Sequence, residues 1–366
     1  MRNILDITDL KNKKVLLRVD FNVPVSEKGQ IEEPFKIERQ KETIDYLVNA
    51  GAKVLIVSHI TAVDTFADLI PQLHTTLGHE VNFVKNIADI QGYFDNYVGP
   101  MLLENIRRFT GEKENSGELA EKLTKSFDVY VNDAFAECHR NYASISAVTK
   151  LLPSYAGFLI KKETVELEKA IQASQKGKVV IVGGAKAETK VPVVKNFIDK
   201  AGLILLGGVV ANDVLKEKGQ DMGSSIVDGN SKELLVDLDI NDPKLLVPED
   251  FIVFDNKILD IGEKTVKKYT DAIKNASMVI WNGPMGLFEN PAFATGTQKI
   301  AEAIADSNAY KIIGGGDTIS AVSKFKIQNS KFNFISTGGG AMLEFLAGEK
   351  LPGLEALGYY NQNGQI

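Results

Sequence analysis

The stretch "KIIGGGDTISAV", Lys311 to Val322, places three glycines, an aspartate and a threonine between a short apolar run and a helix-like pattern. The stretch "FNFISTGGGAMLEFL", Phe332 to Leu346, repeats the arrangement shortly afterwards. Glycine leaves the backbone bare, and amides at the start of a helix point at whatever lies in front of it. Two strand-to-helix turns of this kind predict an α/β fold whose strand ends approach a ligand.

The composition is that of a globular protein with room for two packed domains. The chain has 366 residues, of which 44% are hydrophobic and 25% charged. This balance excludes a disordered protein. The formal net charge of −6 argues against a general nucleic-acid binder, so any site for a polyanion must be local.

The cellular setting is predicted from cysteine usage and from the apolar runs. Cys138 stands alone, which excludes an intramolecular disulfide and a cysteine-based metal site. The N-terminal "MRNILDITDL" lacks the apolar segment of a signal peptide, and the longest apolar run, "GLILLGGVVA", is too short to span a bilayer. We therefore expect a cytoplasmic protein that has no membrane or nucleic-acid partner.

Buried-strand runs alternate with helical patterns along the whole chain. Examples are "KVLLRVDF", "AKVLIVSH", "KVVIVGGA" and "SMVIWNG", with "RQKETIDYLVNAG" and "TGTQKIAEAIADS" as helical patterns. This alternation predicts two lobes, each a parallel sheet flanked by helices. We expect an N-terminal domain over 1–156, a connecting helix over 157–174 and a C-terminal domain over 175–351. The tail, 352–366, is expected to pack back on the first lobe.

Glycine-rich turns follow five strands of the second half. They are Gly183–Lys186, Gly207–Gly208, Asn282–Gly286, Gly314–Asp317 and Thr337–Gly340. In a parallel sheet these strand ends share one edge, and bare amides there suit a polyphosphate. Each turn alone could equally be a tight turn without a ligand. Neither a Walker P-loop nor the G-x-G-x-x-G dinucleotide fingerprint is present.

The chain resembles the phosphoglycerate kinase family through motifs that occur in the family's order. They are "LLRVDFNVP", "LLEN" with Arg107, "NDAFAECHR", "VGGAKAETK", "WNGPMGLFE", "GGGDT" and "STGGGAMLEFLAGEKLPG". The resemblance covers nearly the whole chain. It implies a glycolytic enzyme that transfers a phosphoryl group between 1,3-bisphosphoglycerate and Mg-ADP, giving 3-phosphoglycerate and ATP. It also implies glycerate binding in the first lobe, nucleotide binding in the second and hinge closure in a monomer.

The resemblance assigns roles in the nucleotide lobe. Lys190 is expected to stabilise the migrating phosphoryl group, Lys186 and Asn282 to contact phosphates, and Glu289 to bind the ribose. Asp317 is expected to hold Mg²⁺, with Thr318 alongside. Solvated surface charges are the alternative for the lysines. The remaining nucleotide positions are Gly183, Gly184, Gly207, Gly208, Gly314, Gly315 and Gly316, and the amides of Gly338, Gly339 and Gly340 are expected to be catalytic.

A second set of residues is expected to bind the glycerate substrate. It comprises Asp20, Asn22, Lys36, His59, Arg107, His139 and Arg140, with Lys36 also expected to act catalytically. Arginine and asparagine donate directional hydrogen bonds to phosphate and carboxylate, and a carboxylate accepts from a hydroxyl. Without the resemblance, the two histidines would more often be structural. Cys138 is not a convincing nucleophile.

Four departures from the family pattern leave an alternative open. Lys36 and Ala62 stand where the family usually carries arginine, Thr61 replaces a glycine, and Val209 replaces a glycine near the expected adenine pocket. Lysine keeps the charge but loses the planar fork. The alternative is a non-catalytic or weakly active relative that binds nucleotide. A dinucleotide-dependent dehydrogenase is disfavoured because the fingerprint is absent.

Overall fold

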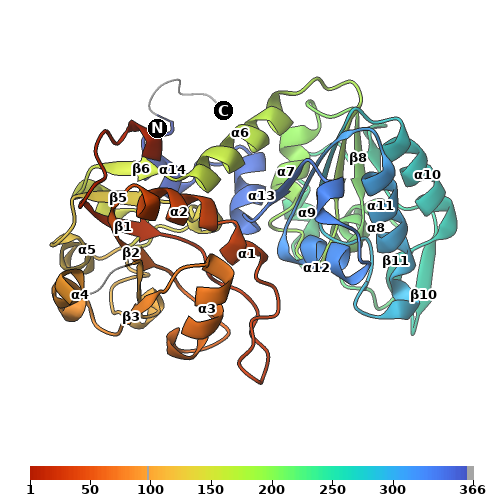
Figure 1. Cartoon of the computed structure of the whole chain (residues 1–366). Helices are drawn as coiled ribbons and strands as arrows, with labels where there is room; N and C mark the ends of the chain where they lie inside the picture. The colour runs from red at the N-terminus through yellow and green to blue at the C-terminus, as the bar shows by residue number, and fades with distance from the viewer. Residues whose placement is uncertain (97–98, 361–366) are drawn as a thin grey trace. The chain divides into compact units, whose positions relative to one another are not determined.

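The computed structural model describes residues 1–96 and 99–360, and the chain divides into two compact units (Figure 1). Unit 1 comprises Met1–Thr164 together with the residues from Lys350 onward, and unit 2 comprises Val165–Glu349. The division falls within α6 (Phe158–Gln172), in the stretch expected to form the connecting helix. The tail predicted to rejoin the first lobe extends over 352–366, of which 361–366 lie outside the described residues.

Unit 1 contains a six-stranded parallel sheet in the order β3-β4-β2-β1-β5-β6. Its central strands read as continuous apolar runs because both faces of the sheet are covered. The strands are β1 (Lys14–Arg18), β2 (Lys53–Val57), β3 (Asn82–Val84), β4 (Met101–Leu103), β5 (Val129–Asn132) and β6 (Ser154–Ala156). The helices are α1 (Phe35–Glu38), α2 (Lys41–Asn49), α3 (Ile70–Leu77), α4 (Ile90–Asn96), α5 (Gly117–Thr124) and α14 (Pro352–Ala356). Short 3-10 helices are η1 (Ile4–Asp6), η2 (Ala67–Leu69), η3 (Ile87–Asp89), η4 (Ile106–Arg108), η5 (Phe135–Glu137) and η6 (Ala147–Lys150).

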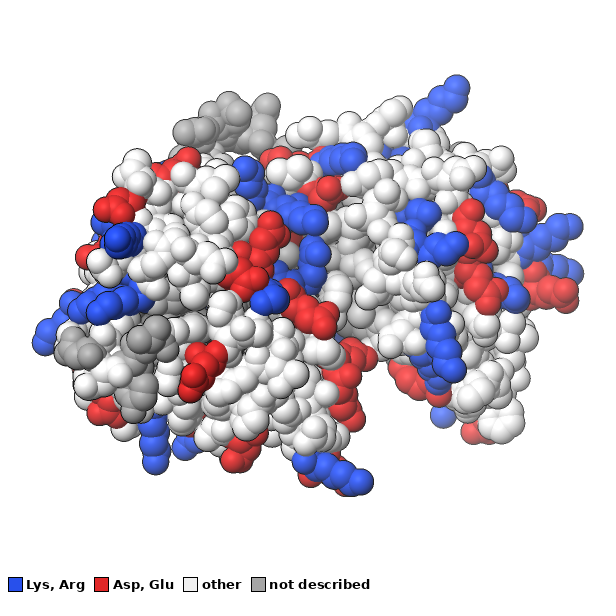
Figure 2. Space-filling view, in the orientation of Figure 1, with Lys and Arg blue, Asp and Glu red and all other residues white. Residues whose placement is uncertain are grey.

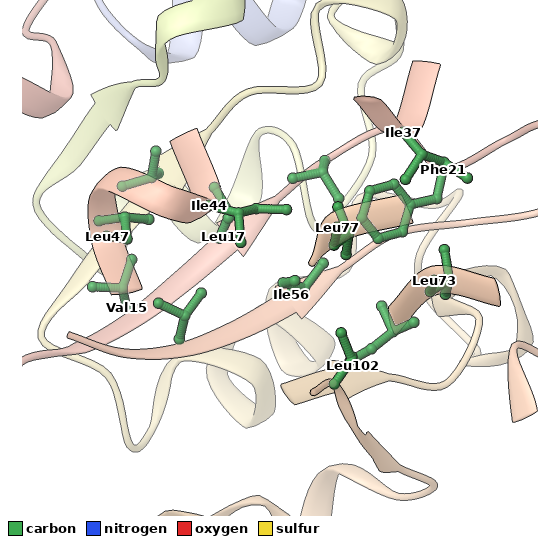
Figure 3. Close-up of a cluster of buried hydrophobic side chains, with 14 of the residues drawn as sticks. Val15, Leu17, Phe21, Ile37, Ile44, Leu47, Ile56, Leu73, Leu77 and Leu102 are labelled. Carbon is green, nitrogen blue, oxygen red and sulfur yellow. The ribbon is translucent and has the colours of Figure 1, made fainter. Parts of the chain in front are cut away.

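Alternate side chains of β1 enter the two cores of unit 1. Val15 and Leu17 pack with residues of α2 and α3 on one face, where Ile44 and Leu77 are fully buried (Figure 3). Leu16 points to the opposite face and joins a second cluster that includes side chains of α5. Each fully buried aliphatic side chain contributes about 1.5–3 kcal/mol relative to exposure. The period of two along β1 therefore attaches helices to both faces of the sheet.

Unit 2 is built on a second six-stranded parallel sheet, in the order β14-β13-β12-β7-β8-β9. The two sheets with their flanking helices confirm the predicted fold class. The strands are β7 (Lys178–Val182), β8 (Leu203–Leu206), β9 (Leu245–Leu246), β12 (Met278–Asn282), β13 (Tyr310–Gly314) and β14 (Phe334–Ser336). The helices are α7 (Val191–Phe197), α8 (Gly208–Glu217), α9 (Ser231–Leu234), α10 (Glu263–Lys274), α11 (Thr295–Asp306), α12 (Gly316–Lys324) and α13 (Gly340–Leu346), with η7 (Pro291–Phe293) and η8 (Asn329–Lys331).

An antiparallel hairpin, β10 (Phe251–Phe254) and β11 (Lys257–Ile261), lies outside the parallel pattern and was not predicted. Its turn residues, Asp255 and Asn256, both have positive φ, the conformation that a two-residue hairpin turn requires.

On the face shown in Figure 2, Lys and Arg side chains are interspersed with Asp and Glu over both units. No helix in the described part of the chain is long and apolar enough to cross a bilayer.

The strand order of each sheet reverses beside its first strand. In unit 1 the chain moves from β1 to β2 on one side and later to β5 on the other. In unit 2 it moves from β7 to β8 and later to β12. Ligands of open α/β sheets bind outside the carboxyl ends of the strands at such switch points. The turns after β1, β5, β7 and β12 are therefore the first places to look for a site.

An acidic and a basic side chain bond to the backbone at the two ends of α6. Within unit 1, the amide of Ile160 donates to the Asp133 carboxylate over 3.1 Å. Within unit 2, the Lys178 ammonium donates to the Ile171 carbonyl over 2.9 Å. An acceptor at a helix N-terminus and a donor at its C-terminus satisfy backbone groups that have no partner within the helix. Each unit thus stabilises the end of the helix that it carries.

Asp133→Asn is expected to become more stable relative to the wild type as pH rises from about 4 to about 7. Burial raises the pKa of Asp133 to about 7, against hydrogen bonds from Thr43 and the Ile160 amide that lower it. The folded protein therefore retains a proton that the unfolded chain releases, and folding loses up to about 1.4 kcal/mol per pH unit in that window. Urea unfolding at several pH values measures the difference. Asp68→Asn, at an exposed position, is the control, and a pH-independent difference for Asp133→Asn would contradict the expectation.

Candidate active site

The strand-end turns of unit 2 are joined to one another at the carboxyl edge of the sheet. Gly184 donates its amide to the Pro284 carbonyl over 2.7 Å, which links the turns after β7 and β12. The Asn282 side-chain amide donates to the Gly314 carbonyl over 2.8 Å. The Gly283 amide donates to the Thr318 hydroxyl over 2.7 Å. Asn282 and Thr318, both predicted nucleotide residues, therefore brace the turns of β12 and β13.

Packing between these turns supplies a reason for glycine that is independent of any ligand. A Cβ on Gly183 would overlap the Pro284 carbonyl, and one on Gly283 would overlap the backbone of Gly183. A Cβ on Gly208, whose φ is 57°, would meet the Gly184 backbone. Side chains crowd further glycines: Met285 lies against Gly207, Met342 against Gly314 and Asn282 against Gly315.

Gly316 is different, because no described atom outside its own turn lies within 4 Å of where its Cβ would be. Its φ is also outside the left-handed region. It is the first residue of α12, directly before Asp317. Neither packing nor backbone conformation explains a glycine here, so a bare surface for a ligand remains the reason that fits.

A cavity of about 370 Å³ opens beside this edge, entirely within unit 2. Gly184, Gly208, Glu289 and Asp317 of the predicted residues line it. Apolar side chains line much of the remainder, including Phe251, Ile258, Ile226 and Leu287, together with the polar residues Asn212, Ser224, Lys257 and Asp260. Such a mixture of apolar wall and a few polar groups suits a small ligand with a ring and charged groups. Val209 also lines this cavity, so the substitution noted in the sequence changes its wall.

Lys190 lies directly before α7 and is 7% exposed. Its ammonium is beside Gly184, whose φ is 88°. Burial lowers the pKa of Lys190, the charge of Asp317 opposes this, and the charge of Lys186 adds to it. The predicted catalytic lysine, the predicted metal ligand and the second lysine thus interact electrostatically.

Of the three glycines whose amides are expected to be catalytic, Gly338 already donates its amide to the Ser336 hydroxyl over 3.1 Å, while Gly339 and Gly340 lie at the start of α13.

In unit 1, Asp20 and Lys36 form an ion pair of 2.9 Å at the end of β1. Burial raises the pKa of Asp20, but the charge of Lys36 and the hydrogen bonds from Lys36 and the Asn22 amide outweigh it, so the pKa lies below its usual value. Burial likewise opposes the charge of Lys36, and the Asp20 carboxylate raises the pKa of Lys36 above its usual value. Both groups are therefore charged near neutral pH.

Thr61 fixes the orientation of Asn22, the next predicted substrate residue. The Thr61 amide donates to the Asn22 side-chain oxygen over 3.0 Å, and the Thr61 hydroxyl donates to the same atom over 2.8 Å. The Asn22 oxygen is thus engaged, which leaves its NH₂ group as the donor for a ligand. Thr61, noted in the sequence only as a departure from the family pattern, therefore has a local function.

His59 is fully buried between two charged groups. Arg18 lies 3.4 Å from Nδ1, and because arginine can only donate, Nδ1 must be the unprotonated nitrogen of a neutral ring. Burial, and then the charge of Arg18, lowers the pKa of His59 to about 3. Burial and the charge of Arg140 lower the pKa of His139 to about 4. Both histidines are neutral near pH 7, and an anion would meet them as hydrogen-bond partners rather than as cations.

Arg107 forms an ion pair with Glu137, over 3.1 Å, while Arg140 is exposed. Sequence reasoning missed Glu137 and Arg18. Arg18 left a signal, since a charge within the apolar run "KVLLRVDF" of a buried strand needs buried partners; here they include the Ser144 hydroxyl at 2.9 Å. Cys138 is buried, and burial raises the pKa of its thiol, which agrees with the view that it is not a nucleophile.

Two units, each built on a parallel sheet, indicate the class of two-domain phosphotransferases. One unit has cations and hydrogen-bond donors at its sheet edge, and the other has glycine turns, Lys190 and Asp317, which lines a cavity. The comparisons with known proteins identify it further. The family model described as phosphoglycerate kinase matches residues 4–349. The chain therefore belongs to the phosphoglycerate kinase family.

Individual relatives agree over almost their whole length. The phosphoglycerate kinase of Dictyoglomus turgidum is 39% identical, with 97% of this chain and 98% of the relative covered. That of the Wolbachia strain from Drosophila simulans is 38% identical, with 95% and 96% covered. The crystal structure of phosphoglycerate kinase from Pyrococcus horikoshii superposes with a TM-score of 0.87 at 32% identity, with 99% and 100% covered. The structure of the enzyme from Coxiella burnetii gives 0.82 at 32% identity, with 98% of both chains covered.

Two glycine substitutions on the same edge should separate packing from ligand binding. Gly183→Ala is expected to destabilise the protein by about 2–4 kcal/mol because its Cβ would overlap the Pro284 carbonyl. The Cβ introduced by Gly316→Ala would lie in open space. The free energy of unfolding should therefore stay within about 1 kcal/mol of the wild type, while ADP binding weakens about tenfold or more. Urea unfolding and calorimetric ADP titration measure the two effects. Unchanged ADP affinity in Gly316→Ala would show that this position does not face the nucleotide.

Proposed function

We propose that this chain transfers a phosphoryl group between 1,3-bisphosphoglycerate and Mg-ADP, giving 3-phosphoglycerate and ATP. The observation that carries the proposal is the division of chemistry between two sheet edges. Unit 1 presents donors for phosphate and carboxylate groups, and unit 2 presents a cavity lined by Asp317, whose charge interacts with Lys190. The names of the matched relatives support the same reaction and do not favour the non-catalytic alternative.

In unit 1, the glycerate would be held by the residues around the Asp20–Lys36 pair. The Asp20 carboxylate would accept from the substrate hydroxyl, and Asn22 would donate through its NH₂ group. Lys36 would neutralise the transferring phosphoryl group. Arg107 and Arg140 would bind the other anionic groups, with His59 and His139 as neutral hydrogen-bond partners.

In unit 2, the cavity would take the nucleoside, with Glu289 on the ribose and the phosphates along the glycine turns. Asp317, exposed at the cavity, would hold Mg²⁺. The described residues contain no group of three or more possible metal ligands, and one carboxylate with substrate phosphates is a usual arrangement for Mg²⁺. Bound Mg²⁺ would neutralise phosphate charge. Lys190, buried and close to Asp317, would stabilise charge on the migrating group, as would the Gly339 and Gly340 amides.

Direct in-line transfer between substrates held on different units requires the units to close. Closure would bring the reacting atoms together and exclude water, which limits wasteful hydrolysis of ATP. We propose a hinge at α6, since the unit boundary falls within it. All the residues used belong to one chain, so a monomer suffices, and the glycolytic reaction suits a cytoplasmic location.

A coupled assay for 3-phosphoglycerate-dependent consumption of ATP tests the proposal directly. Turnover is the expected result. Binding of ATP without turnover would instead favour the non-catalytic relative, and binding of NAD would favour a dehydrogenase.

Lys190→Ala should reduce kcat by about a hundredfold or more while changing the Kd of ADP less than about threefold. Its charge is most useful where negative charge is redistributed in the transition state. Asp317→Ala should weaken Mg-ADP binding as well as turnover. Steady-state kinetics and calorimetry give both values, and Lys176→Ala, at an exposed site of unit 2, is the control. Near-normal turnover in Lys190→Ala would remove it from the mechanism.

Lys36→Arg is expected to raise kcat or lower the KM for 3-phosphoglycerate about threefold to tenfold, with little change in the KM for ATP. A guanidinium can keep the Asp20 contact and still donate to the substrate, whereas one ammonium already bonds to Asp20 over 2.9 Å. Arg39, one turn away, is the possible substitute cation, so Arg39→Ala is measured in parallel. A loss of activity in Lys36→Arg with no effect of Arg39→Ala would show that the pocket is adapted to lysine.

A further inference from the structure

We propose that Glu137 sets the anion affinity of the glycerate half-site by serving as its resident counter-ion. Glu137 is the last residue of η5, and only 7% of it is exposed. Its carboxylate lies among the residues expected to bind an anion. The inference rests on the proposed function, because it assigns a role within that half-site.

The carboxylate of Glu137 faces two of the expected substrate ligands. One oxygen accepts from the Arg107 guanidinium over 3.1 Å. The other lies 3.6 Å from Nε2 of His59. Because Arg18 fixes Nδ1 of His59 as the acceptor, the ring proton is on Nε2 and faces Glu137. One carboxylate therefore occupies the direction in which both residues would donate to a ligand.

The charges of the surrounding residues explain why a carboxylate lies at this position. Arg18, Lys36 and Arg107 bring three positive charges, and Asp20 pairs with Lys36 alone. Burial raises the pKa of Glu137 above its usual value and Asp20 adds to this, while the charges of all three cations oppose it, so Glu137 interacts electrostatically with each of them. The buried Glu112 also interacts electrostatically with Arg18 and Arg107, but Glu137 is the carboxylate that forms an ion pair with Arg107.

An incoming phosphate or carboxylate would compete with Glu137 for Arg107. It would also meet the repulsion of a carboxylate a few ångströms away, in surroundings where water screens charge weakly. The half-site is therefore weaker for anions than its cations alone would make it. A purely positioning role would have the opposite consequence, since loss of Glu137 would leave Arg107 disordered and substrate binding would weaken.

Glu137→Gln removes the charge and keeps the size and an acceptor oxygen for Arg107. Calorimetric titration of the full chain with inorganic phosphate, and separately with 3-phosphoglycerate, should give Kd values about threefold to tenfold lower than the wild type. The KM for 3-phosphoglycerate should fall similarly, with the Kd of ATP within about twofold. Glu118→Gln, which removes an exposed carboxylate of the same unit, should change none of these values.

Unchanged or weaker binding of both anions in Glu137→Gln would overturn the proposal. Glu137→Asp keeps the charge, and its phosphate affinity should stay within about twofold of the wild type; a tightening equal to that of Glu137→Gln would also overturn it. If Glu137→Gln does not fold, Glu137→Ala, which removes the same charge, is used for the same measurements. Tighter phosphate binding in a chain without turnover would contradict the proposed function alone, whereas turnover with unaltered anion affinity would contradict the role of Glu137 alone.

Discussion

Gly183 and Gly283 meet where β7 and β12 run side by side, and a Cβ on Gly283 would overlap the backbone of Gly183. This approach occurs at the switch point of the sheet, where the strand order reverses. It allows the amide of Gly184 to reach the Pro284 carbonyl, and so joins turns that are about a hundred residues apart in the sequence. The positions of Lys190, Asn282 and the cavity wall all depend on this junction.

Unit 1 arranges its switch point in a different way. Charged side chains, rather than bare backbone, fill the edge beside β1, and two ion pairs form among them. Asp20 is paired with Lys36, and Arg107 with Glu137. Desolvation keeps His59 neutral between them. In unit 2 the close approach of glycine backbones shapes the sheet edge, which suits a nucleotide with its ring system. In unit 1 paired charges shape the edge, which suits a small, highly charged acid.

The sequence allowed the fold to be predicted because its strands are buried on both faces and end in recognisable turns. The β10–β11 hairpin was not predicted, although "FDNK" carries a two-residue turn signal, because an antiparallel hairpin lies outside the alternation of strands and helices. The site was only partly predictable. Motifs indicated Lys190 and Asp317, but the partners of a side chain depend on tertiary structure. Thr61 contacts Asn22 across 39 positions and Glu137 contacts Arg107 across 30, and neither spacing follows from a periodic pattern.

The return of the chain to unit 1 after Glu349 has a consequence for the order of folding during synthesis. Leu351 and Leu354 are fully buried in unit 1, and the Gly353 amide donates to the Cys138 carbonyl over 2.8 Å. A Cβ on Gly353 would lie 2.8 Å from the Cys138 Cα, so this segment fits closely against the loop after β5. These residues are synthesised only after all of unit 2. Unit 2 can therefore complete its core first, and unit 1, although synthesised earlier, is completed last.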